Sequence, residues 1–364
     1  MEIFYISKFN SYPPLYGEQV HVYNVIKELV ALGHKIYVCE YEQHPMAEKV
    51  SLNSLSSILT NLDAVYIRQT LSNDLDWTNR LVKISRNYKV IWELNLPKYE
   101  SIFSINNLYN YKSKNIFGAV KKHIIRFKDL LKVHYSWYKK KKQARYVDGI
   151  VTVSNVLSKY LKSEFNLPVA VITNGANCNY LFNELTDKLD VLIAGSRLAW
   201  IDWDTPIQVV KAFANNKKVH FHIVDFQLDL NYKNVSYYKR MPQDELQKLI
   251  ARVHVGFVLY KKYDWCPIGF YNSPLKLFEY MGNCKVVIAS KMGQIKEVIK
   301  DKYNGLLVEP ENYKDICEAI EFLLTYPNAY KEIAHNAYNT IKSYYSWKKA
   351  AQKTINFITN LKET

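Results

Sequence analysis

Short apolar runs alternate with helical segments along most of the chain, and this alternation is the strongest constraint on its fold. The first run, Ile3–Ile6, is followed by apolar residues at helical spacing from Val22 to Val30, and Gly33 ends that predicted helix. Further strand-like runs follow at 36–39, 64–67, 90–92 and 147–153. Strands separated by helices form parallel βαβ units. The sequence therefore predicts an α/β protein with an open, doubly wound parallel sheet.

A second series of the same kind begins at Val191. Its strand-like runs lie at 191–195, 220–224, 253–259 and 286–289. Because 364 residues exceed the usual size of one domain, we expect two: an N-terminal domain at 1–185 and a C-terminal domain at 186–345. The last segment, 346–364, has a helical pattern and could cross back to the first domain. Open α/β sheets bind ligands beyond the carboxyl ends of their strands, so two such domains are expected to face each other across a cleft.

Composition and short motifs exclude several classes of protein. With 48% apolar and 23% charged residues, the chain has the make-up of a folded globular protein. No segment approaches the roughly 20 apolar residues of a membrane-spanning helix, and the start of the chain lacks the features of a signal peptide. The five cysteines form no CxxC pair and the histidines show no metal-ligand spacing. We therefore expect a cytoplasmic protein with reduced thiols and no metal site.

The net charge of +15 is concentrated in one helical segment, 112–145, where Asp129 is the single acidic residue. An apolar stripe runs among its lysines and includes Val120, Ile124, Phe127, Leu131 and Tyr138. This make-up is typical of a helix that lies on an anionic membrane, here through residues 117–142. An ordinary amphipathic helix, packed on its own domain, explains the pattern equally well. No nucleic-acid partner is expected, because no helix-turn-helix, RNA-recognition or zinc-finger pattern accompanies the charge.

The most informative motif is SPLKLFEYMG, which starts at Ser273. Ser273 is a good N-cap and Pro274 a good first helical residue, so a helix is expected to begin here. Its free N–H groups and dipole would favour a diphosphate. Lys276 and Glu279 share a face, where the cation could neutralise phosphate and the carboxylate could bind sugar hydroxyls. An ordinary surface ion pair explains their spacing at least as well.

This motif and the segment after it resemble the donor-binding signature of the GT-B glycosyltransferases of family four, the glycosyl transferases group 1. The similar pieces are SPLKLFEYMGNCKVVIAS and KMGQIKEVIKDKYNGLLVEP. Other segments resemble landmarks of the family in the family's own order: PPLYGEQVHVYNVIKELVALGHKIYV, VIWELNLP, IVTVSNVLSKYL, VITNGANCNYLF, VLIAGSRLAWIDWDTPIQVVKAF and NVSYYKRMPQDELQKLIARVHVGFVLY.

The resemblance implies a GT-B fold, with two Rossmann-like domains facing a cleft. It also implies a retaining enzyme that moves a sugar from a nucleotide-sugar donor to a glycan or lipid-linked acceptor in glycoconjugate or polysaccharide synthesis. No covalent intermediate, cofactor or donor-binding metal is expected. A cytoplasmic enzyme of this kind could attach peripherally to the inner face of the membrane.

The resemblance assigns the donor-binding residues one by one. Glu279 matches the second glutamate of the family's Glu-x7-Glu motif and is expected to bind the donor ribose. Tyr271, followed by Asn272, stands where the first glutamate usually contacts the sugar, so this contact and the identity of the sugar stay open. Ser273 lies at the expected diphosphate. Arg197 matches the arginine that contacts the diphosphate.

The charge around the diphosphate departs from the family pattern. The lysine expected about six residues after the arginine is absent, and Asp202 and Trp203 occupy that region. Lys276 could supply the missing charge from the other side. Arg197 and Lys276 would then stabilise the leaving group, which makes both candidate catalytic residues.

Two candidate positions belong to the expected N-terminal domain. Gly17 would let backbone approach the leaving diphosphate, although the family usually has two glycines here and a plain turn glycine is the alternative. Glu93, a candidate catalytic residue, and Asn95 end an expected strand. They could orient the acceptor hydroxyl or the transferred sugar, or serve as hydrogen-bonded structural groups.

The nucleobase is expected near residues 238–242, which include Arg240 and Met241. Two alternative functions remain open. A catalytically silent GT-B scaffold would explain Tyr271 and the missing lysine, and a basic membrane-surface or nucleic-acid-binding protein would explain the charge. A Rossmann dehydrogenase and a P-loop enzyme are disfavoured, because the chain lacks GxGxxG after a strand and GxxxxGK[ST].

Overall fold

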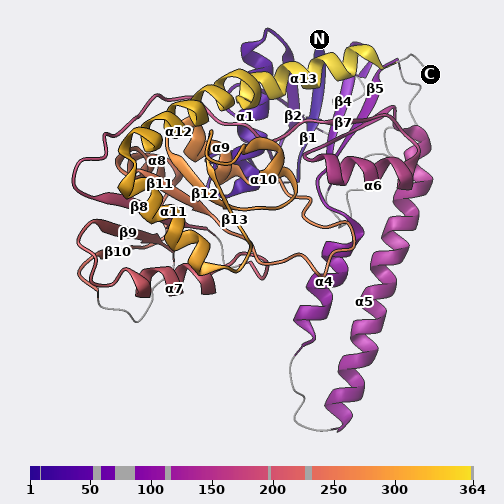
Figure 1. The fold of residues 1–364 in the computed structure, drawn as a ribbon. Helices are drawn as coiled ribbons and strands as arrows, with labels where there is room; N and C mark the ends of the chain where they lie inside the picture. Colours follow the sequence, from indigo (N-terminus) through magenta and orange to yellow (C-terminus); the bar gives the residue numbers. More distant parts are fainter. Residues whose placement is uncertain are drawn as a thin grey trace. The chain divides into compact units, whose positions relative to one another are not determined.

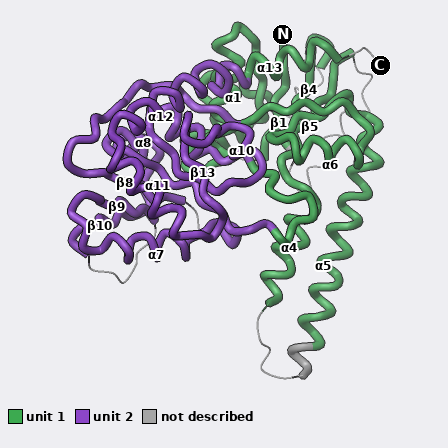
Figure 2. The backbone as a smooth tube through the Cα atoms, viewed as in Figure 1, with its two compact units in different colours: residues 1–173, 264–272, 351–364 green, residues 174–263, 273–350 purple. Residues whose placement is uncertain are grey.

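The chain forms two compact α/β units (Figures 1 and 2). Unit 1 consists of residues 1–173, 264–272 and 351–364, and unit 2 of 174–263 and 273–350. The chain thus first passes from unit 1 to unit 2 after Thr173, whereas the sequence predicts the domain boundary between residues 185 and 186. The computed structural model describes residues 1–8, 10–51, 59–69, 87–110, 116–195, 198–225 and 232–361.

Unit 1 contains a parallel seven-stranded sheet in the order β3-β2-β1-β4-β5-β6-β7. Its strands are β1 (Glu2–Ile6), β2 (Lys35–Cys39), β3 (Glu48–Val50), β4 (Ala64–Gln69), β5 (Lys89–Leu94), β6 (Gly149–Thr152) and β7 (Val169–Val171). Its complete described helices are α1 (Gly17–Ala31), α4 (Lys98–Leu108), α5 (Ile116–Gln143), a 3-10 turn (Ala144–Tyr146) and α6 (Asn155–Phe165). The strand order reverses between β1 and β4, where a doubly wound sheet offers its ligand site.

Unit 2 contains a parallel six-stranded sheet in the order β10-β9-β8-β11-β12-β13. Its strands are β8 (Leu189–Ala194), β9 (Val219–Val224), β10 (Val235–Tyr238), β11 (Val255–Val258), β12 (Val286–Ser290) and β13 (Leu306–Val308). Its helices are α7 (Asp204–Ala212), α8 (Gln243–Arg252), α9 (Leu275–Gly282), α10 (Gly293–Val298), α11 (Tyr313–Thr325), α12 (Pro327–Thr340) and a π-helical turn (Ile341–Tyr345). The order reverses between β8 and β11. This point is therefore the expected ligand site of unit 2.

The structure contains a strand at each predicted apolar run. These runs could be recognised because the central strands are apolar on both faces. Val191, Phe221 and Val255 are fully buried within the core of unit 2, as covered parallel sheets require. All five cysteines are free thiols, as expected. In the part of the chain that the structure describes, none of the helices combines the length and the apolar character that a bilayer crossing requires.

The last helix, α13 (Trp347–Asn360), lies within the segment 346–364 that the sequence predicts as helical, and its residues from Ala351 onward belong to unit 1. Gly149 of β6 accommodates this end of the helix, since a Cβ there would lie 2.6 Å from the ring of Phe357. The Lys89 ammonium also donates to the carbonyl of Ile358 at 3.0 Å. The C-terminal residues are thus an integral part of the first unit.

In unit 2, helix α9 lies unusually close to the sheet. A Cβ on Gly256 of β11 would lie 2.2 Å from the ring of Tyr280, a contact that real side chains do not make. Tyr280 itself is buried. Only glycine therefore allows α9 this position, which also sets the location of Lys276 and Glu279 on the same helix.

We predict that Gly256→Ala destabilises unit 2 by about 1–3 kcal/mol, the usual cost of an overpacked core. Urea denaturation of the purified protein measures this cost. Because the Tyr280 ring is the group that must move, the same substitution should cost less in a Tyr280→Leu background. An equal cost in both backgrounds would contradict the proposed contact.

Candidate functional site

A pocket lies at the point where the strand order of unit 2 reverses. It comprises about 220 Å³ of space not filled by atoms, open solvent included, beside the carboxyl ends of β8 and β11. Its lining residues are Ile193, Ala194, Ile201, Asp202, Trp203, Pro206, Phe257, Leu259 and Lys276. Apolar walls with a few polar groups are typical of small-molecule sites. The fold and the pocket thus indicate the same place.

The side chain of Lys276 supplies a positive charge in the lining of this pocket. Its ammonium donates to the carbonyl of Ala194, at the end of β8, over 2.6 Å. Burial lowers the pKa of Lys276 to about 8, although the nearby Glu279 acts in the opposite direction. The charged amine is therefore held by a neutral carbonyl, and an anion in the pocket would stabilise it further.

Gly195 makes this approach possible. A Cβ at this position would lie 2.7 Å from the Lys276 ammonium nitrogen. A side chain here would therefore push the lysine away from the end of β8. In Gly195-Ser196-Arg197 the predicted diphosphate contact belongs to the arginine, but the structure gives the glycine a role of its own. Ser196 and Arg197 lie outside the described residues, so the predicted diphosphate contact of Arg197 stays a prediction.

Glu279 has a different partner from Lys276. Gln243, the first residue of α8, donates its amide to the Glu279 carboxylate over 2.6 Å. Burial raises the pKa of Glu279, while the Gln243 hydrogen bond and Lys276 act against that rise. The two motif residues are thus directed to separate groups rather than joined as an ordinary surface ion pair.

The predicted base-binding residues lie in the loop between β10 and α8. Arg240 is exposed and Met241 is half-buried. Two residues later Gln243 begins α8 and contacts Glu279. The structure therefore connects this loop to the predicted ribose-binding residue, a link that the spacing in the sequence did not reveal.

The prediction that Ser273 caps the motif helix is wrong. Pro274 is the N-cap, α9 begins at Leu275, and no side chain caps its first turn. The Ser273 hydroxyl instead accepts from the backbone N–H of Asn174 at 3.1 Å, and the Asn174 amide donates to the Ser273 carbonyl at 2.6 Å. Ser273 thus fastens the chain before the helix and leaves the N–H groups of its first turn without a side-chain cap.

Asp202 and Trp203 replace the expected second cation, and both line the pocket. Asp202 is buried and accepts from the backbone N–H of Thr205 at 3.0 Å, so it orders the start of α7. The pocket therefore carries an acidic group where the family pattern has a basic one. Among the lining residues that the structure describes, Lys276 carries the positive charge.

Glu93 lies in unit 1, at the carboxyl end of β5, and its carboxylate is fully engaged. It is paired with Arg68, lies 3.0 Å from the His21 ring nitrogen, and accepts from Tyr66 at 2.9 Å and from Asn95 at 2.6 Å. Burial alone would raise the pKa of Glu93, but Arg68 and His21 outweigh it and hold that pKa well below its usual range. In this state Glu93 organises the strand ends. Its predicted contact with acceptor or sugar stays a prediction.

Tyr271 is fully buried in unit 1, and its hydroxyl donates to Glu100 of α4. Its carbonyl accepts from the Ser154 hydroxyl at 2.6 Å. The residue at the first-glutamate position thus holds segment 264–272 in place. Asn272 next to it is half-buried, and Gly17 is exposed at the start of α1.

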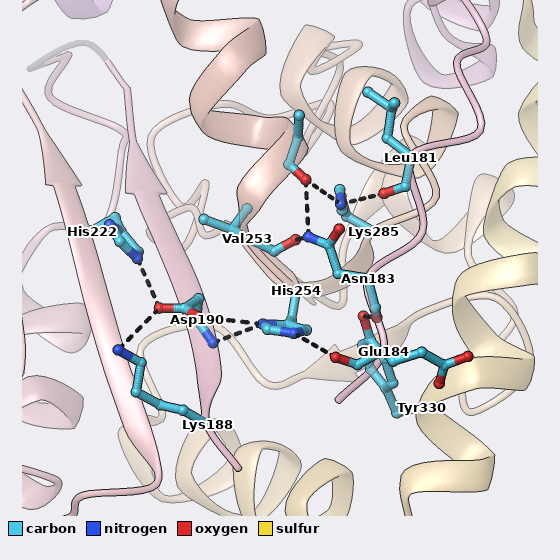
Figure 3. Close-up of polar contacts among 11 residues, drawn as sticks. Leu181, Asn183, Glu184, Lys188, Asp190, His222, Val253, His254, Lys285 and Tyr330 are labelled. Carbon is cyan, nitrogen blue, oxygen red and sulfur yellow. Dashed lines mark hydrogen bonds and ion pairs between the residues drawn. The ribbon is translucent and has the colours of Figure 1, made fainter. Parts of the chain in front are cut away.

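A second polar cluster lies at the amino ends of β8 and β11 (Figure 3). Asp190 lies 2.9 Å from the His222 ring nitrogen, and its backbone N–H donates to the His254 ring at 3.0 Å. The other His254 ring nitrogen contacts the Glu184 carbonyl at 3.3 Å, and burial lowers the pKa of His254. A neutral, doubly hydrogen-bonded histidine at this edge of the sheet is structural.

Metal ligation does not account for this cluster. In the ranges that the structure describes, no group of three or more His, Cys, Asp and Glu side chains is arranged to hold a metal ion.

The sequence is similar to one family model and to two glycosyltransferases of one organism. The family model "Glycosyl transferases group 1" matches residues 184–340. An uncharacterized glycosyltransferase of Methanocaldococcus jannaschii is 24% identical over 355 residues, which cover 93% of each chain. Another uncharacterized glycosyltransferase of that organism is 30% identical over 113 residues, 29% of each chain.

Solved structures show the same fold. Sucrose-phosphate synthase from Thermosynechococcus elongatus is similar with a TM-score of 0.64 and 14% identity, over 99% of this chain and 98% of that one. Anabaena HepE, solved in complex with UDP and glucose, is similar with a TM-score of 0.65 and 13% identity, over 99% of this chain and 100% of that one. Residues 184–340 thus match the model of the glycosyl transferases group 1, and the two Rossmann-like units have the fold of the GT-B glycosyltransferases.

Proposed function

We propose that this glycosyltransferase takes a hexose from a nucleoside diphosphate sugar, with retention at the anomeric carbon, and transfers it to a glycan or lipid-linked acceptor in polysaccharide or other glycoconjugate synthesis. The observation that carries the proposal is the Lys276 ammonium in the pocket at the reversal point of unit 2. Its described hydrogen-bond partner is a neutral carbonyl, so a diphosphate in the pocket would gain a charge-assisted hydrogen bond.

The chemistry of the donor explains why a cation is needed there. When the bond between sugar and diphosphate breaks, positive charge develops at the anomeric carbon and negative charge on the departing diphosphate. Stabilising that leaving group is the main electrostatic task. Lys276 and the uncapped first turn of α9 could perform it, with Arg197 in the role that the resemblance implies and no metal ion required.

Glu279 supports recognition of the nucleoside. A carboxylate held by Gln243 is fixed in direction and keeps further acceptor capacity for ribose hydroxyls. Because the HepE structure contains UDP, UDP-sugars are the first donors to test.

The proposed setting is the cytoplasmic face of a membrane, where a lipid-linked acceptor would be reached. Support comes from the basic helix α5, whose lysines would be attracted to anionic headgroups.

We expect a nucleoside diphosphate to stabilise the protein and Glu279→Ala to weaken this effect. At a 100-fold excess over Kd, a bound nucleotide adds about 2.7 kcal/mol to the free energy of unfolding. A thermal-shift screen of UDP, GDP, ADP and their sugars measures the gain in Tm. Losing the ribose contact should weaken binding by roughly 5- to 150-fold, the effect of about 1–3 kcal/mol. Glu318→Ala, an exposed change on α11, is the matched control and should bind like the parent.

Hits from the screen are then tested for consumption of the donor in the presence of glycan and lipid acceptors. Stabilisation by nucleotides without hydrolysis or transfer of any sugar would favour the silent scaffold. No response to any nucleotide would contradict donor binding altogether.

We predict that nucleotide affinity falls as pH rises above about 8. The pKa of Lys276 is about 8 in the free protein, and a bound diphosphate would raise it because it favours the charged amine. Binding is then strongest below pH 8 and weakens by up to about tenfold per pH unit above it. The nucleotide does not cause this change, because the second phosphate pKa is near 6.

Isothermal titration between pH 7 and 9.5 measures the dependence. Lys276→Met should bind more weakly at every pH, with a flat profile in this range. A parent profile that matches the Lys276→Met profile would show that this amine does not contact the diphosphate.

A further inference from the structure

Helix α5 exposes a continuous apolar stripe to solvent. Its side chains recur at intervals of three or four residues, so they lie along one face of the helix. Each of them is 50–62% exposed: Val120, Ile124, Phe127, Leu131, Tyr135 and Tyr138. From the first to the last the stripe is about 27 Å long, at 1.5 Å per residue.

The opposite face of α5 makes the contacts within unit 1. The Arg126 guanidinium donates to the side-chain carbonyl of Asn106 on α4 at 2.9 and 3.1 Å, and Tyr109 donates to Asp129 at 2.9 Å. Near the end of the helix, the buried Trp137 donates to Glu164 at 2.7 Å. Figure 1 shows α4 and α5 side by side, extending beyond the sheet of unit 1. The stripe is therefore not the face that attaches α5 to its unit.

Lysines flank the stripe on one side, where the exposed Lys121, Lys128, Lys132 and Lys139 lie. The exposed His123 and His134 lie on the other side, together with Lys141, whose ammonium pairs with Glu164 at 2.9 Å. The ammonium of Lys139 lies 4.6 Å from the centre of the Tyr135 ring, and that of Lys142 lies 4.7 Å from the Tyr138 ring. Lysines placed beside interfacial tyrosines keep their charge at headgroup level while the rings enter the apolar layer.

The acidic residue of the helix is on the other face. Asp129 accepts from Tyr109 and pairs with Lys132 at 2.9 Å. The stripe and its borders therefore present apolar and cationic groups together. This charge excludes a simple pairing with a second copy, because two such helices would bring their lysine rows side by side. Nucleic acid would match the lysines but would leave the apolar side chains exposed to water.

We propose that α5 is a docking helix that lies in the surface of an anionic lipid bilayer, with its apolar stripe at the level of the acyl chains and its lysines among the headgroups. The helix lies on the membrane rather than crossing it. This inference deepens the proposed membrane setting of the enzyme and rests on it. It does not require nucleotide binding, so it can be tested without a donor.

Two neighbouring isoleucines provide a matched test of the stripe. Ile124 is on the stripe and 50% exposed, whereas Ile125 lies outside it and is 37% exposed. Ile124→Asp and Ile125→Asp change charge and helix propensity equally. In co-sedimentation with vesicles of phosphatidylcholine and phosphatidylglycerol, the parent and Ile125→Asp should bind, and Ile124→Asp should bind at least tenfold more weakly. Equal binding by the two variants would overturn the docking face.

The charge requirement has its own control. Lys121→Gln with Lys128→Gln should weaken binding to anionic vesicles by roughly 30-fold, from the contribution of two lysines near the surface. Lys348→Gln with Lys349→Gln removes the same charge from exposed positions of α13 and should have little effect. Equal losses in the two double variants would show that net charge alone attracts the protein.

Three further outcomes would indicate a partner other than an anionic lipid surface. Binding to pure phosphatidylcholine as strong as to anionic vesicles, or displacement of the protein from vesicles by stoichiometric oligonucleotide, would contradict the proposal. So would a dimer in solution that Ile124→Asp dissociates. Circular dichroism and the nucleotide-induced gain in Tm check that each variant is folded. A protein that responds to nucleotide but ignores vesicles would refute the docking helix alone, and the reverse result would refute donor binding alone.

Discussion

The close seating of α9 on the sheet of unit 2 is the constraint on which the candidate site depends. Gly256 leaves room for the Tyr280 ring, and Gly195 leaves room for the Lys276 ammonium. These two glycines bring one helix within reach of the ends of two strands. As a result, Lys276 reaches the carbonyl of Ala194, while Glu279 lies on the same short helix beside α8. The position of α9 in the candidate site thus depends on its close approach to the sheet.

Much of the fold could be predicted because its central strands are buried on both faces. Runs such as Ile3–Ile6 and Val286–Ala289 are continuously apolar, which identifies them as interior parallel strands. Four strands of three or four residues each could not be predicted from the sequence: β3, β7, β10 and β13. Strands of that length carry too few residues for an alternation to be recognised, and all four lie at a sheet edge, where burial is weaker.

The candidate site was predictable only where its contacts are local. The motif placed Lys276 and Glu279 on one helix because their spacing is a property of the helix itself. Partners far along the chain could not be found this way: Gln243 lies 36 residues from Glu279, and Glu100 lies 171 residues from Tyr271. The failed cap at Ser273 has the same cause. The N–H of Asn174, 99 residues away, takes the hydroxyl that a local rule assigns to the helix start.

Two lysines of unit 2 show why geometry, rather than titration, indicates the candidate site. Burial lowers the pKa of both Lys276 and Lys285 to about 8. The Lys285 ammonium donates to the carbonyls of Leu181 and Ala251 (Figure 3), and its side chain is fully buried. It therefore fixes the chain that enters unit 2 and has no space for a ligand. Lys276 bears the same electrostatic cost, but it shares its charge with one described carbonyl and lines an open pocket. An anion would stabilise a desolvated cation that lies beside open space, and this is the physical basis for proposing that Lys276 contacts a diphosphate.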